Sequence, residues 1–200
     1  MNTYSVFKSD EHIDWEVIPT IVLENDPWHD DIGYRMYGQV AWNESGLYVH
    51  QWCKEDFIRA EIFESNKMVS DDSVMEFFIM PGYEDRYINI EVNPNGRFIF
   101  GFCRKRNDWI RLIAMTGEDY LTAKTNYTEN GWEVEYSIPI ELFRLLYKAD
   151  FAFKSGQSYR ANMFKGGGLS ETPHNLVWNP IDASKHDYHL SGDFGEMILA

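Results

Sequence analysis

Short apolar runs separated by Gly, Pro, Asn and Asp constrain this chain more than any other feature. The clearest runs are YGQVAWNESGLYVHQWC, SVMEFFIMPGYEDRYINIEVNPNGRFIFGFC, WIRLIAMTG, NGWEVEYSIPI, YRANMF and FGEMILA. Many short strands with turn signals at this interval are typical of an all-β sandwich or jelly roll. We therefore predict a single domain over residues 1–200, an antiparallel β-sandwich that is jelly-roll-like and of immunoglobulin-like size.

Local signals add turns and one helix to this prediction. The sequence ESG predicts a tight hairpin between Trp42 and Leu47, and NPNG predicts a second turn. The segment PIELFRLLYKAD begins with a proline and an acidic first turn, and it places Leu142, Leu145 and Leu146 on one helical face. We expect one short helix that caps one end of the sandwich.

The charge of the chain excludes some partners. Its net charge is −14 and its pI is about 4.7, which repels phosphate backbones and anionic lipid headgroups. No stretch reaches the ~20 apolar residues of a membrane span, and the N-terminus has no basic start followed by an apolar run. We expect no nucleic acid and no membrane as partner, and a cytoplasmic location unless a leader has been removed, which would make the protein extracellular.

The cysteines offer little chemistry. Cys53 and Cys103 each lie in an apolar, strand-like run and have neither CxxC spacing nor a neighbouring histidine in sequence. The sequence favours two buried thiols, with a disulfide as the alternative.

An acidic residue stands in a strand that otherwise looks buried. In DDSVMEFFIMP, alternation places Glu76 on one face with Val74, Phe78 and Met80. If the next turn is centred on YE, Glu76 lies opposite Glu91. Two facing carboxylates need a cation, a shared proton or a hydroxyl-rich ligand.

The following strand supports a polar surface. Tyr87, Asn89, Glu91 and Asn93 form its polar row, with Asn89 opposite Phe78, and this row could line a groove. The alternative is a solvated outer face on which Glu76 pairs with an arginine, for which the candidates are Arg97 and Arg160.

The least regular segment is FKGGGLSETPHNLVWNPIDASKHDYHLSGD. A loop of this length in a compact domain is usually functional or disordered. Three histidines in or near it leave open a metal site, formed by His174, His186 and His189. We expect no cofactor, although the acidic clusters ENDPWHDD and SDDS leave calcium open.

Five motifs in order resemble the family 9 carbohydrate-binding modules and their free-standing relatives. They are DDSVMEFFIMP with YINIEVNPNG, then GWEVEYSIP, YRANMF, HNLVWNP and DFGEMIL. The resemblance runs from IDWEVIP to the last strand and covers nearly the whole chain. It implies a β-sandwich that binds the end of a sugar chain between two tryptophans, with polar side chains on the hydroxyl groups.

Carried over position by position, the resemblance implies a stacking role for Trp178. It implies hydrogen bonds to sugar hydroxyls from Glu76, Asn89 and Asn162. The expected surrounding shell consists of Glu91, Arg160, His174 and Asn175.

The second stacking tryptophan of the family has no counterpart at its usual place. The sequence there has Met68 or Val69. Trp52 is another candidate wall, but its alternation with Tyr48 and His50 favours core packing.

The predicted function is therefore binding of a carbohydrate without cleavage, with glycoside-degrading enzymes as candidate partners. A glycoside hydrolase or lyase that uses Glu76 and Glu91 is the first alternative, because directly opposed residues have Cβ atoms about 5 Å apart, which suits a retaining pair. A histidine-based metal site is the second alternative.

Overall fold

The computed structural model describes residues 1–10, 12–113 and 120–200. The strands in these ranges are β1 (Thr3–Lys8), β2 (Ile21–Leu23), β3 (Arg35–Asn43), β4 (Gly46–Lys54), β5 (Val74–Met80), β6 (Tyr87–Val92), β7 (Phe98–Lys105), β8 (Asp108–Arg111), β9 (Lys124–Thr128), β10 (Gly131–Pro139), β11 (Ser158–Gly166), β12 (Asn175–Val177) and β13 (Gly195–Leu199). The helical elements are α1 (Ile140–Leu146) and four 3-10 turns, η1 (Trp15–Val17), η2 (Val69–Asp71), η3 (Ala183–Lys185) and η4 (Ser191–Asp193).

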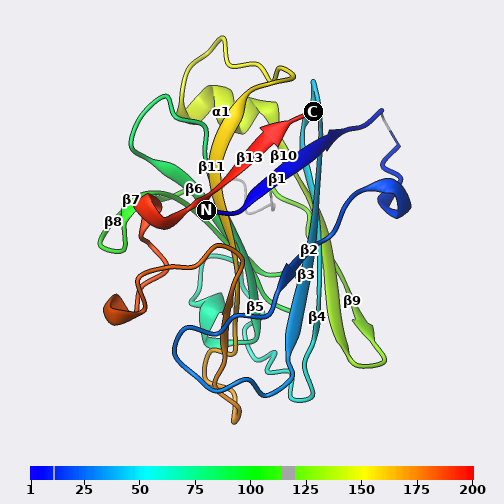
Figure 1. Ribbon diagram of the computed structural model, residues 1–200, viewed down its shortest axis with the longest axis vertical. Helices are drawn as coiled ribbons and strands as arrows, with labels where there is room; N and C mark the ends of the chain where they lie inside the picture. The colour runs from blue at the N-terminus through cyan, green and yellow to red at the C-terminus, as the bar shows by residue number, and fades with distance from the viewer. Residues whose placement is uncertain (11, 114–119) are drawn as a thin grey trace.

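One curled sheet runs through the molecule in the order β8-β7-β6-β5-β11-β13-β1-β3-β4-β10-β9, with β12 on β11 and β2 on β3. The first and last strands lie side by side (Figure 1). The predicted mostly-β fold is correct, but the prediction of a purely antiparallel sheet is wrong at one place. Strand β1 runs parallel to both of its neighbours, β13 and β3, and joins the two halves of the sheet.

The two halves of the sheet enclose the main hydrophobic core. Strand β5 sends Met75, Phe77 and Ile79 into it, and the other half contributes Val49 and Val134, all of them buried. Alternation along each strand produces this segregation, since neighbouring side chains point to opposite faces. Each large side chain buried in this way stabilises the fold by about 1.5–3 kcal/mol.

The predicted hairpin and helix are both present. Strands β3 and β4 pair from Asn43 and Gly46 outward, and α1 begins directly after the predicted proline, near the upper end of the molecule (Figure 1). The buried helix residues are Ile140 and Phe143, whereas Leu145 points to solvent. Leu142 and Leu146 are partly buried and pack against the core as predicted, so the prediction is wrong only for Leu145, because the inward face is centred on Phe143.

Both cysteines are free and buried, as the sequence favoured. Burial raises the pKa of the Cys53 and Cys103 thiols to about 12. No helix in the described ranges has the length and apolar character that a membrane crossing requires.

The outer face of β5 and β6 is covered rather than solvated. A second apolar cluster lies there, formed by Phe78, Tyr87, Cys103, Phe164, Val177 and Phe194. All of β6 is buried, so the predicted polar row does not form an open groove along its whole length. The irregular segment that follows β12 supplies part of this cover, and it leaves an opening beside Glu76 and Glu91.

Candidate ligand-binding site

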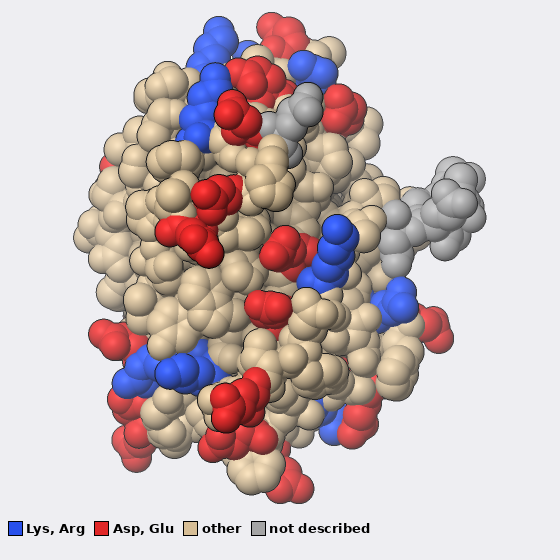
Figure 2. Space-filling view, turned by 90° about the vertical axis from the view of Figure 1, so that its right-hand side faces the viewer, with Lys and Arg blue, Asp and Glu red and all other residues tan. Residues whose placement is uncertain are grey.

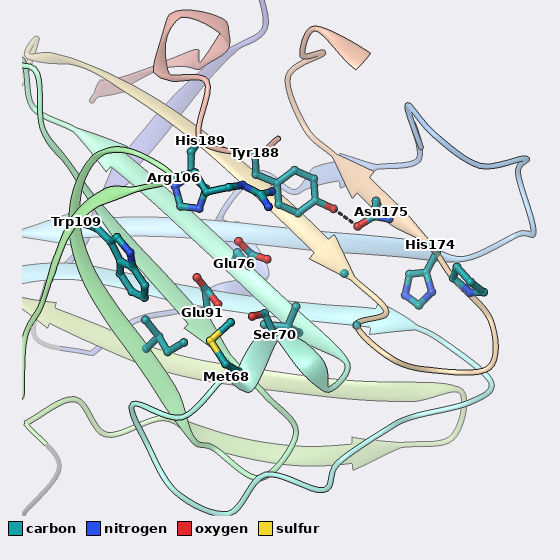
Figure 3. A pocket seen from close by; sticks show the side chains of 15 residues that line it. Met68, Ser70, Glu76, Glu91, Arg106, Trp109, His174, Asn175, Tyr188 and His189 are labelled. Carbon is teal, nitrogen blue, oxygen red and sulfur yellow. Dashed lines mark hydrogen bonds between the residues drawn. The ribbon is translucent and has the colours of Figure 1, made fainter. Parts of the chain in front are cut away.

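A pocket of about 300 Å³ opens on the outer face of β5 and β6 (Figure 3). Four parts of the chain line it: Met68 and Ser70 at η2; Val74, Glu76, Glu91 and Ile99 on β5 to β7; Arg106 and Trp109 around the β7–β8 hairpin; and Gly166, Gly168, Pro173, His174, Asn175, Tyr188 and His189 from the end of β11 onward. Strands fix the floor of this pocket, and the irregular segment supplies one of its walls.

The two carboxyl groups at the floor face each other across the β5–β6 pair. The predicted register is confirmed, with Glu76 opposite Glu91 and Phe78 opposite Asn89. The two glutamates are only 5% and 8% exposed, and both carboxyl groups point into the pocket (Figure 3).

Burial and mutual proximity disfavour charge on this pair. Burial first, and then the neighbouring Glu91, raises the pKa of Glu76 well above its ordinary value. Burial also raises the pKa of Glu91, although hydrogen bonds from Asn89 and Ser70 oppose the rise. Two acids in such contact hold a proton that they would lose in water.

The pair keeps hydrogen-bonding capacity for a ligand. Asn89 donates through Nδ2 to Glu91 Oε1 at 3.2 Å, which orients that carboxyl group. Among the described residues, the buried Oε2 of Glu91 has no hydrogen-bond partner, and the Glu76 carboxyl group accepts none. Buried polar atoms are nearly always paired in folded proteins, so unpaired ones that line a cavity mark a place for a ligand or water.

No arginine pairs with Glu76 within the described ranges. Arg160 instead donates to the backbone carbonyl groups of Gly192, Phe194 and Gly195. The alternative prediction, in which Arg97 or Arg160 neutralises Glu76, is therefore wrong.

Arg106 is the guanidinium group that reaches over the pocket (Figure 3). Its charge lowers the pKa of both glutamates, but burial has the larger effect. The side chain is held from outside, since Nε donates to Asp187 at 3.0 Å and Nη2 to the His186 carbonyl at 3.3 Å.

Two aromatic rings border the pocket. Trp109 on β8 is 37% exposed and lies over Gly101, where a Cβ would meet its ring at 3.5 Å. Tyr188 stacks on Phe164 with ring centroids 4.2 Å apart, and its hydroxyl donates to Asn175 at 2.7 Å. The exposed side chain of Met68 also lines the pocket, at one of the two positions that replace the second tryptophan of the resemblance.

Two histidines of the pocket are neutral. Burial lowers the pKa of His174 and of His189 to about 4. The Nδ1 of His174 donates to the Thr172 carbonyl at 2.8 Å, so its Nε2 accepts a hydrogen bond from Lys165 at 2.9 Å. His189 Nδ1 lies 2.6 Å from the Tyr87 hydroxyl. The surrounding contacts therefore fix both rings.

The described residues contain no group of three or more His, Cys, Asp or Glu side chains arranged to hold a metal ion. His186, the third histidine of the predicted metal site, stacks on Trp28 outside the pocket. In the acidic clusters, Asp26 accepts backbone hydrogen bonds from Trp28 and Asn175, and Asp72 accepts them from residues 61 and 62. These contacts tie turns together.

Four of the eight predicted ligand-binding residues line the pocket, namely Glu76, Glu91, His174 and Asn175. Asn89 lies directly behind them and orients Glu91. The sequence thus identified the floor and one side of the cavity, although their roles in binding stay predictions.

The other three predicted residues lie elsewhere. Trp178 is 9% exposed and belongs to the main core, because alternation after β12 turns Leu176 and Trp178 inward and Val177 outward. Asn162 is fully buried and exchanges hydrogen bonds with the backbone of Asn179. Arg160 is held by backbone carbonyl groups. Trp178, Asn162 and Arg160 therefore hold the segment after β12 in place, and none of the three lines the pocket.

The expectation that Trp52 packs in the core is also wrong. It lies half-buried on the outer face of the β3–β4–β10 half, stacked between Tyr37 and His50, with Trp15 against His50. That half of the molecule faces the viewer in Figure 2, where scattered acidic side chains interrupt broad uncharged areas.

Sequence reasoning missed Arg106, Trp109 and Tyr188 as pocket residues. Trp109 lies in the run WIRL, which predicts a strand but not that this strand forms the edge of the sheet, separated from the strand of Glu91 by β7. Tyr188 lies in HDYH, where the flanking histidines drew attention to metal binding. The unusual length of the irregular segment was the signal that could have identified Tyr188 as a pocket residue.

Comparisons with known proteins agree on a family. The model of carbohydrate-binding family 9 matches residues 5–199, so the chain belongs to this family. A crystal structure of a protein from Bacteroides uniformis, provisionally described as carbohydrate-binding, is 21% identical with a TM-score of 0.84, and the match covers 99% of each chain. A search of curated proteins finds no match.

Two solved family 9 modules from Caldicellulosiruptor kristjanssonii share the fold. The one in complex with glucose is 14% identical with a TM-score of 0.66, over 100% of this chain and 96% of that chain. The one in complex with cellotriose is 13% identical with a TM-score of 0.68, over 99% and 93%. At these identities the likeness establishes the fold.

Proposed function

We propose that this protein binds a carbohydrate without cleaving it, in the pocket above Glu76 and Glu91. The observation that carries the proposal is the pair of opposed, buried carboxyl groups with unpaired oxygens at the floor of an open cavity. Membership of carbohydrate-binding family 9 supports the same class of ligand.

The residue types suit a sugar ring. A pyranose has apolar C–H faces and a rim of hydroxyl groups, so an aromatic side chain covers a face while polar groups satisfy the rim. In this pocket Trp109 offers the exposed aromatic surface, the glutamates accept hydrogen bonds from hydroxyl groups, and Arg106 donates.

The cavity fits one end of a sugar chain. Its volume of about 300 Å³ is at the lower limit of small-molecule sites, which suits one or two sugar residues. Related modules bind glucose and cellotriose, so glucose-based sugars form the first panel to test.

Titration with mono- and oligosaccharides, followed by tryptophan fluorescence and calorimetry, tests the proposal. Trp109→Ala should weaken binding about tenfold, or about 1.4 kcal/mol. Trp52→Ala is the matched control, because Trp52 is also partly exposed but lies outside the pocket, and it should leave affinity unchanged. A flat response of the wild-type protein across the whole panel would overturn the proposal.

Hydrolysis is the second candidate function, since opposed strand residues place two carboxyl groups at roughly the separation of a retaining pair. Against it, the pair is nearly fully buried. We expect oligosaccharides incubated with the protein to stay intact, as product chromatography would show. Enzymes that degrade glycosides stay predicted partners of such a binding protein.

A further inference from the structure

We infer that the pocket prefers a sugar with a free amino group, seated between Glu76 and Glu91, over the neutral sugar of the same shape. This inference rests on the proposed function and names the class of sugar. It follows from how the acidic pair is placed and from what surrounds it.

The two acids form an electrostatically incomplete site. They are directly opposed on β5 and β6, more than nine-tenths buried, and both line the cavity. Glu91 Oε2 lacks a hydrogen-bond partner in the described part of the chain, and Asn89, the residue that orients Glu91, also has a buried oxygen without one. Even with Asn89 and Ser70 as donors to Glu91, oxygen atoms outnumber the donors that face them.

The neighbouring groups do not supply a dedicated countercharge. Arg106, from the β7–β8 turn, is bonded to Asp187 and to the His186 carbonyl. From the irregular segment, the Tyr188 hydroxyl group donates a hydrogen bond to Asn175. On β8, Arg111 lies 4.3 Å from the centre of the Trp109 ring and donates to the Asn66 carbonyl.

The remaining titratable groups are neutral or already paired. His174 and His189 have a pKa of about 4 and carry no charge at neutral pH. Lys165, on β11, is bonded to His174 and forms a salt bridge with Glu55 at 3.1 Å. Arg106, Arg111 and Lys165 lower the pKa of one or both acids from a distance, but each of these cations is held by other groups and none is bonded to Glu76 or Glu91.

An ammonium group complements this floor better than a hydroxyl group does. It brings a positive charge and three donors, whereas a hydroxyl group brings one donor. Hydrogen bonds between an ammonium and a carboxylate are about twice as strong as neutral ones. Burial raises the pKa of both acids, so the pair retains a proton to higher pH than free glutamates do, and an ammonium group would take the place of that proton.

A divalent cation fits less well. Calcium takes six to eight oxygen ligands, whereas this floor provides two carboxyl groups, and no metal-binding group of three side chains occurs in residues 1–10, 12–113 and 120–200. Binding of a divalent cation at this pair would therefore count against the inference.

Calorimetry with matched sugars tests the inference. Each set contains a neutral sugar, its 2-amino form and its N-acetylated form, in the gluco, galacto and manno configurations, slightly below neutral pH. We expect the best-bound configuration to favour the amino form at least about tenfold over both uncharged forms. Binding should also release a proton, which titration in buffers of different ionisation enthalpy detects.

Glu91→Gln and Glu76→Gln each keep the shape of the side chain and remove its charge, so each should reduce the preference to less than about twofold. The control is Glu133→Gln, an acid on the other half of the sheet that pairs with His50, and it should keep the preference. Thermal unfolding verifies that each variant is folded.

The outcomes separate the two claims. Equal affinity for amino and neutral sugars overturns the inference and leaves carbohydrate binding intact. Binding of calcium or magnesium alone at the pair, abolished by both glutamine variants, also overturns it. Absence of binding to every sugar removes the proposed function and the inference together.

Discussion

Lys165 Nζ lies 3.1 Å from Glu55 Oε2 inside the protein, where the two side chains are 1% and 0% exposed. Lys165 is on β11, in the half of the sheet that carries the pocket, and Glu55 directly follows β4 in the other half. Glu55 also accepts hydrogen bonds from Ser73 at 2.6 Å and from Trp132 at 3.2 Å. This pair therefore connects the two halves and holds His174 at the pocket.

Removing the lysine should destabilise the fold strongly. Lys165→Met leaves Glu55 buried without its countercharge, and breaking a buried pair in this way costs about 3–5 kcal/mol. Urea unfolding measures the loss. The matched control is Lys185→Met, which breaks an exposed pair with Asp182 and should cost less than about 1 kcal/mol. Equal losses in the two variants would contradict the structural role.

The acidic pair at the floor of the pocket should cost stability at neutral pH. Because burial and mutual proximity raise the pKa of Glu76 and burial raises that of Glu91, the folded state holds a proton that the unfolded chain releases. The two acids thus favour folding at a pH below the ordinary pKa of a glutamate. This contribution to the free energy of unfolding is lost as pH rises through the raised pKa values of the folded protein.

Glu91→Gln should therefore stabilise the protein by about 1 kcal/mol at slightly alkaline pH, with a smaller gain near pH 5. Urea unfolding at the two pH values checks this expectation. A variant that is less stable than wild type at alkaline pH would show that the carboxylate is compensated in the free protein.

The sequence predicted the part of the site that depends on local pattern. Glu76 and Glu91 face each other because alternation and one short turn fix their register, and both features are visible in the sequence. The prediction that Trp178 lines the site was wrong. The direction of its side chain depends on which face of β12 meets the core, and a three-residue strand is too short for its alternation to decide this.

Long-range pairing explains the remaining differences. The parallel position of β1 depends on Thr3 meeting Glu196, which no local pattern indicates. Trp109 reaches the pocket because β8 forms the edge of the sheet, and Tyr188 because the irregular segment folds back over Phe164. Such placements arise from packing between distant segments, so composition and periodicity could not reveal them.

Acid should weaken the fold through the two histidines of the pocket, of which His174 is buried and His189 is half-buried. Burial lowers the pKa of His174 and His189 from 6.5 to about 4. Between these values the unfolded chain binds protons that the folded protein does not, so their contribution is complete above about pH 6.5 and is lost as pH falls toward 4. His189→Gln should make the unfolding free energy depend less steeply on pH in this window.

Urea unfolding at several pH values across the same window measures this slope. His12→Gln provides the control, because His12 is exposed, and its curve should run parallel to that of the wild type. Parallel curves for His189→Gln and wild type would mean that His189 binds its proton as readily in the folded protein as in the unfolded chain.

A glycine beneath the pocket should affect both ligand affinity and the packing of the sheet. A Cβ at Gly101 would lie 2.9 Å from Cys103 Sγ, 3.3 Å from Asn89 Oδ1 and 3.5 Å from the Trp109 ring. The Cys103 sulfur would therefore have to shift and Asn89 would be crowded, whereas the Trp109 ring would be in ordinary van der Waals contact. Because Asn89 orients the Glu91 carboxyl group, Gly101→Ala should disturb the floor of the pocket.

The expected result is about a tenfold loss of sugar affinity, with a stability loss of about 1–3 kcal/mol from overpacking. Gly192→Ala is the matched control, since a Cβ at Gly192 has no neighbour within 4 Å, and it should change neither property. If Gly101→Ala lost stability but kept full affinity, the orientation of Glu91 by Asn89 would not matter for the sugar. Asn89→Ala, which removes the hydrogen bond to Glu91 directly, should lower the affinity to a similar extent if it does matter.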